Sequence, residues 1–92
     1  MNITEVRIRP IKSDGKTRAI ASITFGDSFV VKEFKVVEGS SGLFVSMPSR
    51  KVGNGAYRDI AHPITAEARE EIQTLVLEEF QKKASNSKNV TH

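Results

Sequence analysis

Residues 42–65 read GLFVSMPSRKVGNGAYRDIAHPIT, and this stretch decides the fold of the chain. Leu43 to Met47 predicts a short strand, which Pro48 ends because proline lacks the N–H that a strand ladder needs. Ser49 to Lys51 predicts a basic loop, and after a Gly-Asn-Gly turn Ala56 to Ala61 predicts a last strand. The stretch contains no spacing typical of a catalytic motif, so it favours binding over chemistry.

The residues before this stretch predict three further strands. Ile3 to Ile11 alternates between an apolar face and a charged face, which is the period of a half-buried strand. Arg18 to Phe25 predicts a second strand after a turn at Ser13 to Lys16, and Gly26 to Ser28 predicts the next turn. Phe29 to Val37 is apolar on both faces, which predicts a helix on one side and a partner subunit on the other.

The residues after the stretch predict a helix. His62-Pro63-Ile64 breaks the sheet, and Thr65 is a good N-cap residue. Apolar residues then recur at intervals of three and four positions. This stripe consists of Ala68, Ile72, Leu75, Val76 and Phe80. The predicted fold class is therefore α+β, an antiparallel meander of about five strands followed by one long C-terminal helix, with a single domain at residues 1–84 and a short polar tail, expected to be disordered, at 85–92.

Length and composition limit the classes of protein to consider. A chain of 92 residues with 38% hydrophobic content forms one small domain, and such a domain gains from burying further apolar area in a homodimer. Without cysteine there is no disulfide and no thiolate metal site. The N-terminal residues lack the apolar run of a signal peptide or a membrane span, so we expect a cytoplasmic protein with no membrane partner.

The positive charge is concentrated in the predicted sheet. The formal net charge is +3, and residues 1–60 hold ten basic and six acidic side chains, whereas residues 65–92 hold four basic and five acidic ones. This asymmetry favours a polyanionic partner. An ordinary soluble domain can carry the same net charge, so charge alone leaves both interpretations open.

The residues that could support catalysis or metal binding are isolated in the sequence. His62 and Asp59 could be combined with a serine into a triad, but no nucleophile-elbow motif is present, and a structural role for His62 at the end of a strand is favoured over a hydrolase. Neither a His-x₃-His pair nor an acidic calcium loop occurs. We therefore predict no catalytic residue, no metal site, no cofactor and no small-molecule substrate.

The remaining candidates for function are cationic side chains. Arg50 and Lys51 lie in the predicted basic loop, Arg58 lies on the following strand, and Arg7 and Arg9 project from the polar face of the first strand. Such residues can bind the phosphates of a nucleic acid. They can equally keep a small sheet soluble and protect its edges, and this alternative stays open.

Phe44 offers one further comparison with nucleic-acid-binding proteins. A single aromatic residue on a predicted strand resembles the strands on which RNA bases stack. Its flanking residues do not fit that pattern, so Phe44 is predicted to lie in the core.

Three segments, Arg18 to Thr24, Gly42 to Lys51 and Tyr57 to Ile64, together resemble the stage V sporulation protein G family, the bacterial septation regulators. The likeness covers about residues 1–84. It implies a small dimer with a sheet and a C-terminal helix, which binds DNA at particular sites and RNA in some species, influences septation and sporulation, and is not an enzyme. The family's patterns fall on Ser49, Arg50 and Lys51, on Tyr57, Arg58 and Asp59, and, at the end of the helix, on Gln81, Lys82 and Lys83.

Two hypotheses follow from these observations. The first is a homodimeric regulator that binds DNA, and RNA as a second ligand, through Arg7, Arg9, Arg50, Lys51, Arg58, Lys82 and Lys83. The alternative is a protein-interaction module that acts directly on division or septation proteins without nucleic acid.

Overall fold

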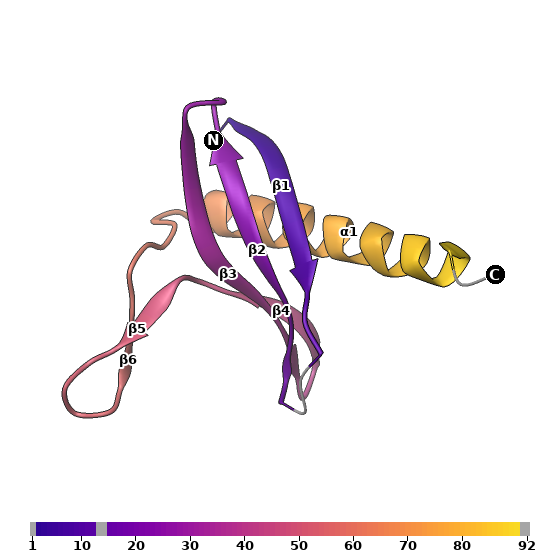
Figure 1. The fold of residues 1–92 in the computed structure, drawn as a ribbon. Coiled ribbons are helices and arrows are strands. Elements are labelled where there is room, and N and C mark those ends of the chain that lie inside the picture. The colour runs from indigo at the N-terminus through magenta and orange to yellow at the C-terminus, as the bar shows by residue number, and fades with distance from the viewer. Residues whose placement is uncertain (1, 13–14, 91–92) are drawn as a thin grey trace.

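The computed structural model describes residues 2–12 and 15–90 and has the predicted α+β fold (Figure 1). A four-stranded antiparallel sheet has the order β1-β2-β3-β4, and a second, two-stranded sheet pairs β5 with β6. In chain order the elements are β1 (Ile3–Pro10), β2 (Thr17–Phe25), β3 (Phe29–Gly39), β4 (Gly42–Ser46), β5 (Ser49–Lys51), β6 (Tyr57–Asp59) and α1 (Ala66–Val90).

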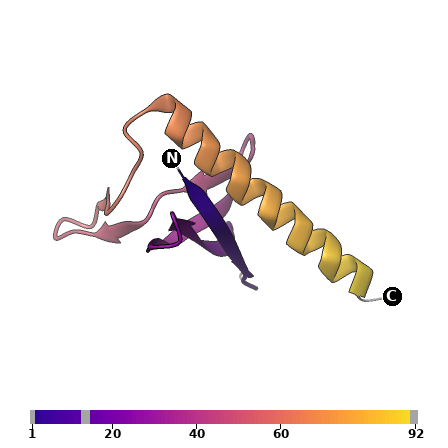
Figure 2. The same ribbon diagram turned by 90° about the horizontal axis from the view of Figure 1, so that it is seen from above.

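The core lies between α1 and one face of the four-stranded sheet. Figure 2 shows the helix on a single side of that sheet. The alternation of the strands directs every second side chain toward the helix, and the most completely buried of these large side chains are Ile23 and Val36. The helix contributes Ile72 and Val76 to the same cluster. Leu77, which the predicted stripe omitted, also packs against this core, whereas Leu75 does not.

Two hydrogen bonds from side chains fix the position of the helix. The Thr65 hydroxyl accepts a hydrogen bond from the Ala68 N–H at 3.1 Å, which confirms the predicted N-cap. The Gln73 side-chain oxygen accepts a hydrogen bond from the Val45 N–H at 3.0 Å. Because β4 is an edge strand, this second bond satisfies a backbone donor that would otherwise be unpaired, and it ties the helix to the sheet edge.

The meander differs from the prediction after β4. Ser49 to Lys51 was predicted to be a loop, but it forms β5 and pairs with β6 outside the main sheet. Pro48 is buried where the chain leaves the sheet, and its carbonyl accepts a hydrogen bond from the Ile60 N–H at 2.6 Å. The predicted Gly-Asn-Gly turn closes the ribbon, with the Gly55 N–H bonded to the Val52 carbonyl at 2.9 Å. Pro48 therefore ends one sheet and closes the base of another.

The structure differs from the sequence prediction at Phe44 and at the C-terminal end of α1. Phe44 was predicted to lie in the core, but it is 43% exposed on the sheet face that α1 does not cover, because its neighbour Val45 takes the inward position. The helix extends to Val90 and so includes residues 85–90, which the sequence analysis assigned to the polar tail. The first half of the predicted turn at Ser13 to Lys16 lies outside the described residues.

Candidate nucleic-acid interface

A groove along the edge strand β1 brings together cationic side chains that are far apart in the sequence. It has a volume of about 890 Å³ and is lined by residues of β1, β2, β3 and the C-terminal half of α1. Four of the predicted binding residues line it, together with one cation that the sequence analysis did not select. These five residues are Arg7, Arg9, Lys32, Lys82 and Lys83.

The charges in the groove are only partly neutralised by neighbouring carboxylates. Arg7 forms an ion pair with Glu5 at 3.1 Å, and Lys82 forms one with Glu79 at 3.5 Å. Within residues 2–12 and 15–83, no ion pair engages the three other cations, which are Arg9, Lys32 and Lys83. The groove therefore presents unpaired positive charge to solvent.

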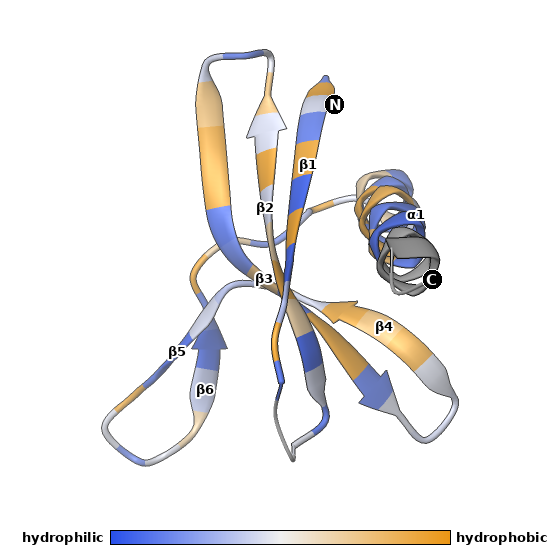
Figure 3. Cartoon of the chain, turned by 45° about the vertical axis from the view of Figure 1, so that its right-hand side comes forward, coloured by the Kyte–Doolittle hydropathy of each residue, from blue (hydrophilic) through white to orange (hydrophobic). Residues whose placement is uncertain are grey.

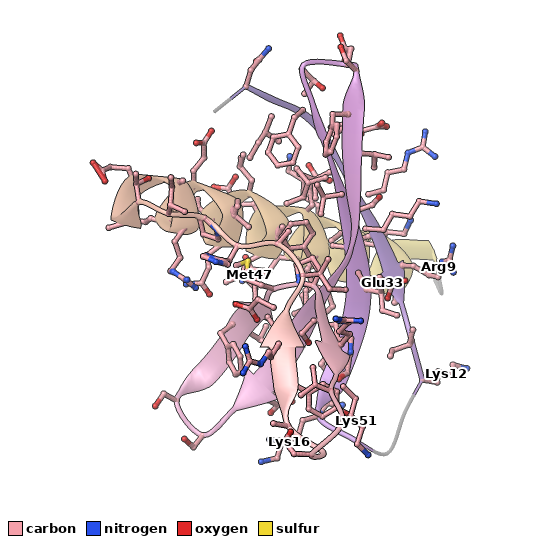
Figure 4. All side chains as sticks on the ribbon, turned by 90° about the vertical axis from the view of Figure 1, so that its left-hand side faces the viewer. Arg9, Lys12, Lys16, Glu33, Met47 and Lys51 are labelled. Carbon is pink, nitrogen blue, oxygen red and sulfur yellow. The ribbon has the colours of Figure 1, made fainter. Side chains whose placement is uncertain are left out.

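Lys32 is placed at the groove by an irregularity in β3. The register of β3 against β2 shifts between the partners of Ala21 and Ile23, so Lys32 and Glu33 together face one position of β2. Glu33 has a φ of 74°, which is the left-handed region that non-glycine residues rarely adopt. Figure 4 shows Glu33 beside Arg9, and both residues line the groove. Lys32 and Glu33 are the two consecutive charged residues of β3, and this pair was the sequence signal for the bulge.

The other three predicted cations lie on the β5–β6 ribbon. Arg50 is directly opposite Arg58, and Lys51 is directly opposite Tyr57. All four side chains are exposed. The structure describes no ion pair to any of the three cations among residues 2–12 and 15–83. Two like charges at directly opposed positions destabilise a strand pair, so an anionic ligand on this ribbon would relieve a repulsion that the isolated chain retains.

The seven predicted cations thus form two groups. Arg7, Arg9, Lys82 and Lys83 line the groove, whereas Arg50, Lys51 and Arg58 project from the molecule on the ribbon. Figure 3 shows the ribbon extending away from both the sheet and the helix, with mainly hydrophilic colouring. Any single ligand that contacts both groups has to span the distance between the sheet edge and the ribbon.

The sheet face opposite α1 carries apolar side chains that no helix covers. Val37 and Phe44 are a cross-strand pair on this face, and Phe44 is 43% exposed. The Phe44 ring lies over Gly39, where an added Cβ would stand 2.9 Å from the ring. A side chain at position 39 would therefore force the Phe44 ring to move.

His62 is the histidine that the sequence analysis considered together with Asp59 as part of a catalytic triad. The structure places it in the connection between β6 and α1, exposed, with its Nδ1 atom 3.0 Å from the Pro63 carbonyl oxygen.

Among the described residues, no group of three or more His, Cys, Asp or Glu side chains could hold a metal ion. The described residues also include no helix with the length and apolar character needed to cross a membrane.

Comparison with known proteins identifies the family. The family model described as SpoVG matches residues 1–82. This chain belongs to the SpoVG family. The resemblance inferred from the sequence is therefore confirmed, and the match includes every predicted cation of the groove and ribbon except Lys83.

Curated relatives of this SpoVG-family chain carry the name "Putative septation protein SpoVG". The relative from Clostridium perfringens (strain ATCC 13124) is 56% identical over 82 residues, which cover 89% of this chain and 91% of the relative. The relative from Clostridium beijerinckii is 56% identical over 85 residues, which cover 92% and 93%. The relative from Lachnospira eligens is 56% identical over 82 residues, which cover 89% and 93%. The similarity thus extends over nearly the whole of each protein.

Proposed function

We propose that this SpoVG-family chain is a homodimeric regulatory protein that binds DNA, with RNA as a second ligand, and acts in septation in the cytoplasm. The observation that carries the proposal is the groove in which Arg7, Arg9, Lys32, Lys82 and Lys83 gather. The names of the curated relatives support the connection with septation. The proposal includes no catalytic step, no cofactor and no small-molecule substrate.

The composition of the groove favours contacts with phosphates. Cations that replace condensed counterions on a nucleic acid contribute affinity that is independent of base sequence and falls as salt rises. No aromatic side chain is among the described residues that line the groove, so those residues offer no ring on which a base can stack. The groove is therefore suited to position a sugar-phosphate backbone, while arginines at its rim can reach base edges.

Mobility-shift titrations of a DNA duplex at two salt concentrations test this proposal. The variant Arg9→Ala/Lys83→Ala removes two unpaired groove cations, and we expect weaker binding to every duplex. Its plot of log affinity against log salt should become less steep by about 0.9 for each lost phosphate contact. Arg50→Ala/Lys51→Ala applies the same measurement to the ribbon.

The matched control is Lys12→Ala/Lys16→Ala, which makes the same change in net charge with two exposed lysines outside the groove and the ribbon. It should bind nearly as well as the wild type. If the groove variant and the control have the same affinity and salt dependence, the groove is not the interface. If the groove variant instead self-associates with unchanged affinity, its cations protect the β1 edge from pairing.

The homodimer is supported by the uncovered sheet face. A strand that is apolar on both sides is ordinarily covered twice, and α1 covers β3 on one side only. Sedimentation equilibrium of the wild type should show a dimer, and Phe44→Lys should shift it toward the monomer. Phe29→Lys is the matched control, since Phe29 is 66% exposed at the other end of β3. Equal dimerisation of wild type and Phe44→Lys would remove this face from the interface.

The alternative function is a protein-interaction module that acts on division proteins. It is favoured by Ile60 and Ile64, which are 64% and 89% exposed in the connection between the ribbon and the helix. Large apolar side chains in such positions are typical of protein contacts. A pull-down repeated after nuclease treatment separates the two functions: partners that remain bound favour the interaction module, and partners that are lost favour nucleic acid.

A further inference from the structure

The β5–β6 ribbon carries an aromatic side chain, Tyr57, that is not part of the hydrophobic core. Tyr57 is 68% exposed, although large aromatic rings usually contribute to packing. It begins β6, and its strand partner is Lys51. Its neighbour in sequence, Arg58, is paired with Arg50. The exposed ring therefore shares one face of a short two-stranded ribbon with Lys51, and the opposite face of the ribbon carries two arginines.

We propose that Tyr57 is a base-stacking residue and that the ribbon binds an unpaired base of a single-stranded nucleic acid. This inference rests on the proposed nucleic-acid-binding function and adds a residue and a class of ligand to it. Proteins that bind single strands combine aromatic side chains, on which bases stack, with cations that track the backbone. The described lining of the groove at β1 offers cations without an aromatic ring, whereas the ribbon offers both.

The alternation of side chains along the ribbon allows base stacking on Tyr57 and phosphate contacts with the cations to occur together. Residues that are direct partners point to the same face, so Tyr57 shares a face with Lys51, while Arg50 and Arg58 share the opposite face. A base stacked on Tyr57 brings its own phosphate toward Lys51. The phosphates before and after it can then pass over the ribbon edge toward the arginines.

A paired base cannot make this contact, because its faces are already occupied by its neighbours in the duplex. The Tyr57 contact should therefore favour single strands over duplexes, while contacts from the groove cations are available to both. A second copy of this chain is the competing occupant of the Tyr57 ring. The charged surroundings argue against it, since the buried centres of protein interfaces are depleted in charged residues.

The sequence allows a direct test, because Tyr57 is the single tyrosine in the chain. Protein labelled with 3-fluorotyrosine has one ¹⁹F resonance, which reports on this ring alone. Titration with an unstructured oligothymidylate should shift that resonance, and titration with a duplex should leave it nearly unchanged. Tyr57→Leu should bind the oligothymidylate about 5- to 150-fold more weakly than the wild type, which corresponds to the loss of one stacked base. Tyr57→Phe, which retains the ring, should bind within about twofold of the wild type.

Other outcomes of the binding and ¹⁹F experiments would contradict the inference, and each one indicates a different reason. If Tyr57→Leu binds the oligothymidylate as tightly as the wild type, or if the strand binds without moving the resonance, Tyr57 does not stack on a base. If the resonance changes with protein concentration and not with the strand, a second copy covers the ring. If the wild type binds the duplex with the expected salt dependence in any of these cases, the proposed function stands and this inference alone fails. If the wild type binds neither ligand, both fail.

Discussion

The body of the molecule, formed by β1–β4 and α1, and the ribbon, formed by β5 and β6, are stabilised in different ways. The body holds every fully buried side chain of the described residues, including Ile23, Val36 and Val76. The ribbon has no buried residue, and its strands are three residues long. A two-stranded hairpin of this kind is at best marginally stable in water, because hydrogen bonds alone scarcely offset the loss of conformational entropy.

This difference determines how far each region is ordered before it binds a ligand. In the body, cations occur at an edge whose backbone is held by the core, so the groove is largely formed before a ligand arrives. In the ribbon, like charges face each other and the aromatic ring is exposed, so much of the stabilising contact has to come from a ligand or partner.

Amide hydrogen exchange should separate the two regions most clearly. The amides of β2, the strand between β1 and β3, should exchange only through global unfolding, whereas the Val52 and Ile60 amides should exchange through local opening. The difference should approach the whole free energy of unfolding, on the order of 5 kcal/mol or more for a native domain. NMR-detected exchange measures it. Ribbon amides as slow as those of β2 in the free protein would mean that a second copy covers the ribbon.

Truncation of a core side chain should have the next largest effect. Ile23→Ala removes a side chain with 0% exposure, and it should lower the free energy of unfolding by about 2–5 kcal/mol through lost burial and the cavity that remains. Urea denaturation measures this loss. The control is Ile64→Ala, which truncates a side chain that is 89% exposed and should change stability by less than about 0.5 kcal/mol. A comparable loss in both variants would place Ile64 in a buried contact.

The body of the molecule could be predicted from the sequence because its signals are local. Alternation along Ile3 to Ile11 identified β1 and its two faces, and the spacing of apolar residues identified the helix and the buried positions of Ile72 and Val76. Thr65 identified the helix start because a side-chain cap depends on residues three positions apart. In these elements, periodicity and burial agree, so a single chain is sufficient to infer them.

The binding surfaces could be predicted only in part because they depend on how distant elements pair. The sequence indicated Arg9 and Lys83 separately, but only the packing of α1 against β1 brings them to one groove. Lys32 was missed because its position follows from a register shift between strands. Arg50 was assigned to a loop because two three-residue strands carry too short a pattern to be recognised.

Loss of the helix cap should have a moderate effect on the body. Thr65→Ala removes the hydroxyl that accepts the Ala68 N–H, and it should lower the free energy of unfolding by about 1 kcal/mol. Thermal or urea denaturation followed by circular dichroism measures the change. Thr74→Ala is the control, because Thr74 is exposed within the same helix and alanine has the higher helix propensity. Equal losses in the two variants would show that the cap itself contributes nothing.

Glu33 should give the smallest effect on stability, and it tests the body alone, because it is a residue with a strained backbone at the groove of the body. Glu33→Gly relieves a φ of 74° and should raise the free energy of unfolding by about 0.5–1 kcal/mol, the left-handed penalty less the entropy cost of glycine. Glu33→Gln keeps the backbone strain and removes the charge, so its stability should stay close to that of the wild type. Both variants should bind nucleic acid more tightly, because a carboxylate leaves a groove lined by cations. If only Glu33→Gly gains affinity, the backbone of the bulge and not the charge of Glu33 limits binding in the groove.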